Sequence, residues 1–507
     1  MLARKDVNDE VAKETLLIFE ALIQKIIDWG LDENTDLEIT GKERLGDFRL
    51  RIGFEGKIFS PDVDAEDSIE DMLLKAHDDK LDYSYHLGYN VISIYVGRSY
   101  RSSTLICLIA TLCAVIVYLP LNLLIDKSEQ LNLLNNYVFP LEMLYGNAML
   151  MVGAPMTFFS LLKNLTDTYI VSQRSSDVRR TQMQTIGTSA FAILLAFVAF
   201  FIMSIALSSL EGASASSSGS VNRSFADVVS SLVPPSIFEP FESISPIPLM
   251  FVALLCTYAL CSSGKYFDSL RHAMMACYTL FSRMLHVIIA ALPLFCFLAI
   301  MDVLLSAGLE GGFLDLIFIA CIYLGIMLLL ATYLIRLRAH GIKVIPFMRK
   351  LIPLIRENAT IGSAIDAAPY NIRYCAKTFK MDRTMLERNL PVLAEVNLDG
   401  NCFILMSLTL MFIFVTNTEL PLFSFVGLAA LVLFLSLGAP NQPGSILIGT
   451  LIITMYLNAY DVVCMAIFSE AFLGIAQNLI NVIGDIVMVA IEDSKNKAHA
   501  KNAQVSS

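Results

Sequence analysis

Two carboxylates near the C-terminal end of this chain lie inside long apolar stretches. Asp399 follows Asn397 and precedes Gly400, and Asp485 comes four residues after Asn481. A charged side chain at membrane depth costs roughly 2.5–3.5 kcal/mol on insertion scales, so it usually lines a binding site or a pathway. The neighbouring Asn and Gly residues supply neutral oxygen ligands and open backbone, and hard cations such as Na⁺ favour a shell made only of oxygen. The two carboxylates therefore predict a cation-coupled transporter.

The composition is typical of a polytopic membrane protein. The chain has 507 residues, of which 56% are hydrophobic, and its mean hydropathy is +0.63. This hydrophobic share exceeds that of soluble proteins. Several apolar runs reach the ~20 residues that cross a bilayer. We expect spans near 104–125, 137–171, 183–209, 245–264, 284–308 and 312–338, and further apolar segments around 402–416 and 446–457.

The acidic charge belongs to one part of the chain. Residues 1–97 hold 11 Lys and Arg against 22 Asp and Glu, which accounts for the whole net charge of −11. No basic arm points to nucleic acid, and the N-terminus lacks the pattern of a signal peptide. The ten cysteines form no Cys-x-x-Cys pair, so neither a disulfide framework nor a zinc site is expected.

The first ninety-seven residues alternate between helical and strand patterns. Helical periodicity at 11–29 is followed by strand-like alternation at 35–41 and 47–59, an acidic helical segment at 62–80 and a β-like run at 91–96. These patterns predict a small soluble α+β domain before the first membrane span.

Two later apolar stretches are interrupted by breaker residues. Gly362 to Asp366 precedes Pro369, and the segment 438–444 (Gly-Ala-Pro-Asn-Gln-Pro-Gly) separates two apolar arms that are each too short to span comfortably. Paired broken segments are the sequence signature of a transporter's binding site. Non-helical backbone at that depth persists only where it is buried or lines a cavity.

Basic residues predict the orientation. Alternate connectors contain Arg98 and Arg101, the cluster at 174–180, the pair Lys265 and Arg271, and the cluster at 336–350, whereas the connectors between them contain only two basic residues. By the positive-inside rule the first group is cytoplasmic. Both chain ends are then cytoplasmic, and the acidic domain is intracellular.

The chain resembles the dicarboxylate/amino acid:cation symporter family, which includes the glutamate and aspartate transporters. The resemblance runs from about 100 to 493 and rests on five motifs in the right order. They are Thr188-Ser189, the first-hairpin segment from Gly341 to Pro369, the Asn-Leu-Asp-Gly-Asn of 397–401, the second-hairpin tip at 436–444, and the Asn-Val-Ile-Gly-Asp of 481–485.

The resemblance implies an all-α polytopic fold of eight transmembrane helices and two re-entrant helical hairpins, near 345–380 and 420–455. It implies a homotrimer in which a mobile transport part moves as an elevator and the second hairpin is the gate. We expect residues 1–97 to be an acidic cytoplasmic accessory domain and 98–493 to be the transporter. Within the transporter the scaffold is mainly 98–280, and the transport part includes 183–209 and 284–493. Residues 494–507 form a cytoplasmic tail.

The resemblance also implies three cation sites. Asn481 and Asp485 share one helix face and form the first site with the backbone of Asn397. The second site is Asp399 with Asn397, Thr188 and Ser189, although a tyrosine that contributes there in the family is Thr185 here. The third site is formed mainly by carbonyl groups of Ser436, Leu437 and Ala439. The structural alternative is that each carboxylate is bonded to a neighbouring hairpin.

The expected substrate shell departs from the family. Gln477 stands where acidic-amino-acid carriers have Arg, and Gly474 stands where they have Asp. These changes remove the bidentate carboxylate clamp and the ammonium partner. The pocket therefore favours a less charged or differently shaped solute, unless its amides only bond helices together. The residues expected to bind substrate are Ser363, Asn401, Pro440, Gly444, Gln477, Asn478 and Asn481.

Three further acidic residues lie in the transporter. Glu395 precedes Asn397, Asp366 lies at the tip of the first hairpin, and Glu470 takes a family Asp position. A carboxylate buried in apolar surroundings binds a proton more readily than one in water, so Glu395 and Asp366 are candidate proton carriers. Either could instead pair with a base or face a water-filled cavity.

The sequence as a whole predicts a secondary symporter, coupled to Na⁺, of a dicarboxylate or amino acid in the cytoplasmic membrane. No nucleophile elbow, zinc motif or phosphate loop indicates an enzyme, and we expect no organic cofactor. The expected partners are membrane lipid, the small-molecule substrate and two further copies of the chain, with no nucleic acid; the partner of residues 1–97 is open. The alternatives are a solute sensor that signals through residues 1–97, and a proton-coupled carrier that uses Glu395.

Overall fold

The structure is a computed structural model of the 507-residue chain. It describes residues 9–29, 37–44, 47–55, 59, 69–77, 80–86, 89–96, 100–174, 176–208, 230, 232–361, 363–415, 422–439, 444–457 and 463–506.

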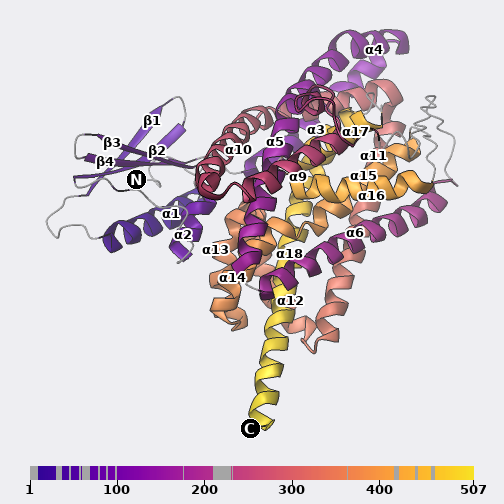
Figure 1. Ribbon diagram of the computed structural model, residues 1–507. Helices are drawn as coiled ribbons and strands as arrows, with labels where there is room; N and C mark the ends of the chain where they lie inside the picture. The colour runs from indigo at the N-terminus through magenta and orange to yellow at the C-terminus, as the bar shows by residue number, and fades with distance from the viewer. Residues whose placement is uncertain are drawn as a thin grey trace.

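The N-terminal part combines two helices with a four-stranded antiparallel sheet in the order β1-β2-β4-β3. Helix α1 packs on α2 and on β4, and the sheet stands to one side of the helical bundle (Figure 1). Leu22, Ile52 and Ile92 lie in its core. The elements are α1 (Asp9–Asp28), β1 (Glu38–Arg44), β2 (Asp47–Glu55), α2 (Ile69–Ala76), β3 (Leu81–His86) and β4 (Tyr89–Val96).

The strands differ from the prediction in one element. The run at 91–96 belongs to β4, and the segment predicted to be helical at 62–80 contains α2, but the strand β3 that follows at 81–86 was not predicted. The side chain of Asn90 is fully buried between these strands and accepts hydrogen bonds from the Tyr83 hydroxyl at 2.7 Å and the Phe59 amide at 3.0 Å. These tertiary contacts stabilise a hairpin that the local pattern of 81–86 does not indicate.

The rest of the described chain is helical. Eight of its described helical segments are long and apolar enough to cross a membrane. The elements are α3 (Tyr100–Leu124), α4 (Lys127–Leu133), η3 (Leu134–Val138), α5 (Phe139–Arg174), α6 (Ser176–Ser208), α8 (Glu239–Glu242), α9 (Pro246–Cys261), η4 (Gly264–Tyr266), α10 (Phe267–Ile289), α11 (Leu292–Ala339), α12 (Val344–Ile361), α13 (Ala364–Tyr374), η5 (Cys375–Phe379), α14 (Arg383–Val396), α15 (Asp399–Val415), α16 (Leu422–Gly438), α17 (Ser445–Tyr456) and α18 (Val463–Ser506).

Two predicted spans have different boundaries in the structure. The span expected at 245–264 is the short helix α9, and the span expected at 284–308 is divided because α10 ends at Ile289 and α11 begins at Leu292. Pro293 lies at the start of α11, where a missing amide proton costs nothing, but it could not continue α10. The long helix α10 carries Asp268, Arg271 and Arg283. Because of these charges its sequence is not a continuous apolar run, and no span was predicted over its first part.

Helix α15 forms the centre of the bundle. Every residue from Asp399 to Phe412 is buried, and α15 contacts α6, α16, α17 and α18. The C-terminal part of α18 extends beyond the bundle (Figure 1). Because α14 ends at Val396 and α15 begins at Asp399, the backbone is non-helical at Asn397 and Leu398 in the middle of this packed region.

Two pairs of short helices fall at the predicted interruptions. Helices α12 and α13 contact each other and are separated by the segment at 362–363, and α16 and α17 are separated by 439–444. Within the second segment, Gly444 has φ of +98°, a left-handed conformation that glycine adopts without strain. Pro440 and the other residues at 440–443 lie outside the described residues.

Candidate functional site

The break between α14 and α15 brings the two predicted carboxylates to one region. Asn397 has extended backbone, with φ of −86° and ψ of 90°. Its amide still donates to the Leu393 carbonyl at 2.7 Å, but the helix ends here and the Asn397 side chain makes contacts with other helices. Asp399 begins α15, and Asp485 projects from α18, which packs on α15. The side chains of Asp399 and Asp485 are buried, at 0% and 3% exposure.

Asp399 accepts hydrogen bonds from two other helices. The Ser189 hydroxyl of α6 donates to its Oδ1 at 2.8 Å, and the Tyr333 hydroxyl of α11 donates to its Oδ2 at 2.7 Å. The Thr188 hydroxyl donates to Oδ1 of Asn397 at 3.5 Å. The structure therefore brings together the residues predicted for the second cation site, Thr188, Ser189, Asn397 and Asp399.

Asp485 and Asn481 contact the same non-helical segment. The Asn397 Nδ2 atom donates to Oδ1 of Asp485 at 2.8 Å, and the Gly400 amide donates to Oδ1 of Asn481 at 2.8 Å. The first predicted site thus joins two side chains of α18 to the break between α14 and α15. It shares Asn397 with the second site, so the two predicted sites are adjacent.

Two glycines permit this close approach of α15 and α18. A Cβ atom at Gly400 would lie 2.5 Å from the Gln477 carbonyl oxygen, and one at Gly484 would lie 2.8 Å from Nδ2 of Asn397. Small residues at helix crossings allow backbones to approach within the membrane. Any larger residue at either position would separate the polar groups.

The hydrogen bonds described for both carboxylates come from neutral groups. Among the residues that the structure describes, no Lys or Arg forms an ion pair with Asp399 or Asp485. Burying an ionised carboxylate carries a large desolvation cost that must be offset by an opposite charge and by hydrogen bonds. The oxygen-rich surroundings of these two residues suit a small hard cation.

Tyr333 is a site residue that the sequence analysis missed. The family tyrosine position is Thr185, whose hydroxyl donates at 2.6 Å to the Gln182 carbonyl of its own helix rather than to a carboxylate. A tyrosine hydroxyl still reaches the site, but from α11. Within the predicted span at 312–338 nothing distinguishes Tyr333 as polar, because a buried tyrosine also serves as a core residue.

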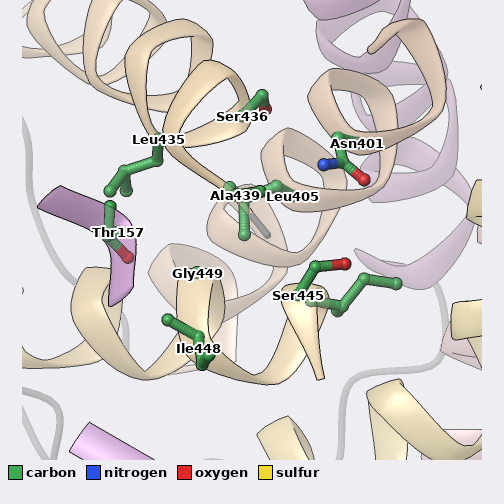
Figure 2. A pocket seen from close by; sticks show the side chains of 10 residues that line it. Thr157, Asn401, Leu405, Leu435, Ser436, Ala439, Ser445, Ile448 and Gly449 are labelled. Carbon is green, nitrogen blue, oxygen red and sulfur yellow. The ribbon is translucent and has the colours of Figure 1, made fainter. Parts of the chain in front are cut away.

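A small cavity lies beside this site, between α15, α16 and α17 (Figure 2). Its volume is about 10 Å³, enough for about one water molecule. Figure 2 shows Asn401 and Ser436 on one side of the cavity and Ser445 and Ile448 on the other. Oδ1 of Asn401 and Oγ of Ser436 are buried and accept or donate no hydrogen bond within the described chain, so both atoms can still bind a ligand.

Among the described residues that were predicted to bind substrate, only Asn401 lines this cavity. Gln477 does not line it, but its Oε1 accepts a hydrogen bond at 3.0 Å from Ser445, which does. Oδ1 of Asn481 is bonded to the Gly400 amide, and Asn478 is only partly buried. Ser363 is buried near the start of α13 and does not line the cavity.

Glu470 positions the start of α17. Its Oε1 accepts from the Gly444 amide at 2.8 Å and its Oε2 accepts from the Leu447 amide at 3.1 Å. A carboxylate at a helix N-terminus satisfies amide groups that have no helical partner and interacts favourably with the helix dipole. The sequence analysis noted Glu470 only as an additional acid, and the structure gives it this capping contact.

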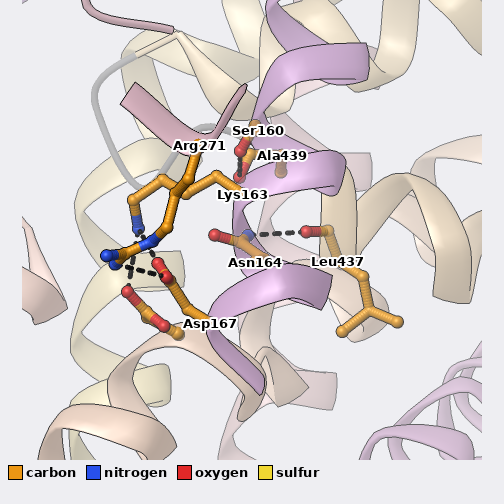
Figure 3. A network of polar contacts seen from close by, with 8 residues as sticks. Ser160, Lys163, Asn164, Asp167, Arg271, Leu437 and Ala439 are labelled. Carbon is orange, nitrogen blue, oxygen red and sulfur yellow. Dashed lines mark hydrogen bonds and ion pairs between the residues drawn. The ribbon is translucent and has the colours of Figure 1, made fainter. Parts of the chain in front are cut away.

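Helix α5 bonds to the end of α16 (Figure 3). The Ser160 hydroxyl donates to the Ala439 carbonyl at 3.2 Å, and Nδ2 of Asn164 donates to the Leu437 carbonyl at 2.8 Å. These are two of the carbonyl groups predicted to form the third cation site. Both carbonyl groups already accept a hydrogen bond from α5. A cation at this site would therefore compete with the Ser160 and Asn164 donors, whose hydrogens carry partial positive charge, for the same oxygens.

A charged network continues along the same face of α5. Nζ of Lys163 lies 2.8 Å from Oε1 of Glu395 and 3.4 Å from Oδ2 of Asp167, and Arg271 of α10 lies 3.1 Å from Oδ1 of Asp167. Glu395, the predicted proton carrier, therefore pairs with a base, which is the alternative that the sequence left open. The side chain of Asp366 lies outside the described residues.

The helices long enough to span a bilayer, the broken helix at Asn397 and the buried carboxylates define a multi-pass membrane transporter. Residues 96–494 match the sodium:dicarboxylate symporter family, and the chain belongs to this family. A comparison with curated proteins found no match. The resemblance drawn from the five motifs is thus confirmed, and with it sodium-linked symport as the general activity of the family.

Proposed function

We propose that this protein is a Na⁺-coupled symporter of a small organic solute, such as a dicarboxylate or amino acid. One observation carries the proposal: Asp399 and Asp485 are buried together without an ion pair to any described basic residue. Na⁺ bound to these carboxylates, with oxygens of Asn397, Asn481, Thr188 and Ser189, supplies the missing positive charge. Transport is coupled to Na⁺ because the closed, filled state binds both ligands better than the open state does.

The substrate binds in the cavity of Figure 2 after the segment at 439–444 has moved. The cavity as it stands holds about one water molecule, so α16 and α17 must separate from α15 to admit a solute. Asn401, Ser436, Ser445 and, after rearrangement, Gln477 offer hydroxyl and amide groups. This donor set contains no Arg, and we therefore expect a solute with less negative charge than glutamate or aspartate.

Helix lengths support re-entrant hairpins. Helices α13 and α17 have 11 and 12 residues, and each would rise less than ~20 Å, well short of the ~30 Å hydrocarbon core. We therefore propose that α12–α13 and α16–α17 enter and leave the membrane on the same side. The α16–α17 hairpin is the gate of an elevator movement, in a homotrimer whose chain ends are cytoplasmic.

Replacing Asp485 by Asn tests the proposal without knowledge of the substrate. Ligands that bind the folded state raise its melting temperature by mass action. We expect NaCl, compared with KCl at equal ionic strength, to raise the melting temperature of the purified wild type and not that of Asp485→Asn. Asp126→Asn, at an exposed position, is the matched control and should keep the Na⁺ effect. An equal Na⁺ effect in Asp485→Asn and the wild type would contradict the assignment.

A sensor is the second candidate, and one contact favours it. Helix α2 of the N-terminal part contacts α13, where Glu70 and Arg373 lie 3.6 Å apart. A solute-driven movement of α13 would thus reach the N-terminal part directly. Deleting residues 1–97 separates the candidates: Na⁺-driven uptake that persists in vesicles supports a carrier, and absence of uptake from both forms supports a sensor.

A further inference from the structure

A second, larger cavity lies on another side of the cation site. Its volume is about 740 Å³, and it is enclosed by α6, α11 and α18; α11 contacts both of the other helices. Arg180, Arg336 and Lys495 contribute to its lining. They come from three separate helices, and each lies close to the end of an apolar segment, namely Arg179–Ser204, Leu316–Ala339 and Val463–Lys497. The cavity therefore opens near one membrane interface.

The cavity has an excess of unpaired positive charge. None of Arg180, Arg336 and Lys495 forms an ion pair with an acid in the described part of the chain. The lining also holds two acids, Asp399, which accepts hydrogen bonds from Ser189 and Tyr333, and Glu492, which accepts one from Asn389, so the three cations outnumber them by one. Three cations on separate helices that face one space attract an anion strongly.

Apolar side chains share the lining of the cavity with these polar groups. Phe191 and Ile335 line it and are 45% and 67% exposed, and Leu329 and Met488 line it and are buried. Exposed apolar side chains on a membrane-spanning helix face lipid tails. A cavity with cations at the interface and apolar groups at membrane depth matches a molecule with an anionic head and a hydrocarbon tail.

We propose that this cavity binds an anionic phospholipid, with its phosphate group at Arg180, Arg336 and Lys495 and an acyl chain against Phe191 and Ile335. Arginine is suited to phosphate because its guanidinium group donates two parallel hydrogen bonds. Arg180 and Arg336 belong to connectors that the positive-inside rule assigns to the cytoplasmic side, and Lys495 lies in the predicted cytoplasmic tail, so the lipid comes from the cytoplasmic leaflet.

The bound lipid lies against the cation site. Thr188, Tyr333 and Asp399 line the same cavity, so a lipid that fills it covers the site from the side of α6 and α11. The lipid thereby excludes water from Asp399 on that side. Na⁺ exchange at Asp399 is then slower with the anionic lipid bound than without it.

Lipid binding can be measured on the full-length protein in detergent by native mass spectrometry and thermal shift. The probes are dioleoyl phosphatidylglycerol, dioleoyl phosphatidylcholine and inorganic phosphate. We expect phosphatidylglycerol to bind and to raise the melting temperature more than phosphatidylcholine does. The triple variant Arg180→Gln/Arg336→Gln/Lys495→Gln should bind phosphatidylglycerol roughly tenfold more weakly or worse.

The matched control removes the same charge from the same end of the molecule. Arg338, Lys343 and Arg349 are exposed and do not line the cavity, so Arg338→Gln/Lys343→Gln/Arg349→Gln should keep the phosphatidylglycerol preference. An equal loss in both triple variants, or a wild type without preference between the two lipids, would overturn the proposal. Stabilisation by inorganic phosphate as large as that by phosphatidylglycerol would overturn the identity of the ligand as a lipid.

Two further measurements separate lost lipid binding from a folding defect and from a loss of Na⁺ coupling. Arg180→Lys/Arg336→Lys keeps the charge and should keep most of the preference, which distinguishes lost binding from a folding defect. The Na⁺ effect on melting temperature is measured on the wild type in phosphatidylcholine alone, so a failure of Na⁺ coupling and a failure of lipid binding give different results.

Discussion

At the scale of single residues, the site is built from hydrogen bonds to charged oxygens. Each oxygen of Asp399 accepts one hydroxyl group, from Ser189 and Tyr333. Hydrogen bonds to ionised groups contribute more than those between neutral groups, about 1.5–3 kcal/mol. They hold the carboxylate in one orientation before an ion binds, which reduces the entropy lost on binding.

Replacing Tyr333 by Phe should reveal this contribution. The change leaves Oδ2 of Asp399 buried without its donor, so we expect a loss of about 1–3 kcal/mol in the free energy of unfolding. The measurement is thermal or denaturant unfolding of the purified protein in Na⁺-free buffer. Tyr137→Phe removes an exposed hydroxyl (the side chain is 66% exposed) and serves as the control. The role of Tyr333 is refuted if both variants are equally stable.

At the scale of elements, α5 joins parts of the chain that are distant in sequence. Its polar face bonds to the end of α16 through Ser160 and Asn164, and to α14 through Lys163. In the proposed mechanism α5 belongs to the scaffold, and α14 and α16 belong to the transport part. These bonds must then break in each transport cycle, and their strength sets part of the barrier to movement.

Lys163 and Glu395 offer a direct test of this contact. Their side chains are 11% and 19% exposed, and removal of one partner of a buried pair costs about 3 kcal/mol because the other charge remains buried. We expect Lys163→Met to destabilise the protein by about this amount in denaturant unfolding. The double variant Lys163→Met/Glu395→Leu should recover most of the loss.

A double-mutant cycle over these variants gives the coupling free energy of the pair. The control pair is Arg383 and Glu387 on α14, whose Nε and Oε1 atoms lie 2.7 Å apart. The Arg383 side chain is mostly exposed, and exposed ion pairs contribute at most about 1 kcal/mol. If Lys163→Met proves as stable as the wild type, Glu395 does not depend on this base, and the proton-carrier alternative regains support.

Sequence patterns predicted the elements better than their contacts. The convergence of Asp399 and Asp485 and the interruptions at 362 and 438–444 were predicted, because Asn, Asp, Gly and Pro within apolar runs mark them locally. The break at Asn397 was not among these predictions. Neither were Tyr333, the Lys163–Glu395 pair and the Glu470 cap. Each depends on which helices pack together, and an apolar span carries little local information about its neighbours.

At the scale of the whole molecule, the N-terminal part responds to pH through a buried histidine. Burial and the nearby Lys80 cation lower the pKa of His77 to about 4, against the opposing effect of Glu14. The pKa of Glu14 is also lowered: its burial acts to raise it, but Lys80 and His77 together outweigh burial. Lys80 forms an ion pair with Glu14.

The sign of the pH effect follows from these shifts. In the unfolded chain His77 binds a proton below pH about 6.5, whereas in the folded chain it stays neutral until about pH 4. The unfolded state therefore binds more protons in this window, and the stability of the N-terminal part falls as the pH falls from about 6.5 to 4, by about 3 kcal/mol for His77. Glu14 adds a loss of the same sign at the acidic end.

Hydrogen exchange of the full chain can measure this effect in β4. We expect the protection of Val91 to Val96, corrected for the intrinsic pH dependence of exchange, to be lower at pH 5 than at pH 7.5. His77→Gln should reduce this difference, and His272→Gln, at an exposed position on α10, should leave it unchanged. An unaltered difference in His77→Gln would mean that another group titrates.

The hydrogen bonds from Ser160 and Asn164 to the carbonyls of Ala439 and Leu437 affect how large a solute concentration ratio the carrier can maintain. If they persist while solute is bound and leave the third predicted site without its ion, each cycle moves one sodium ion fewer. One elementary charge crossing a 100 mV potential supplies about 2.3 kcal/mol, which corresponds to roughly a fifty-fold difference in concentration. Two hydrogen bonds on one helix would thus limit how steep a solute gradient the cell can maintain.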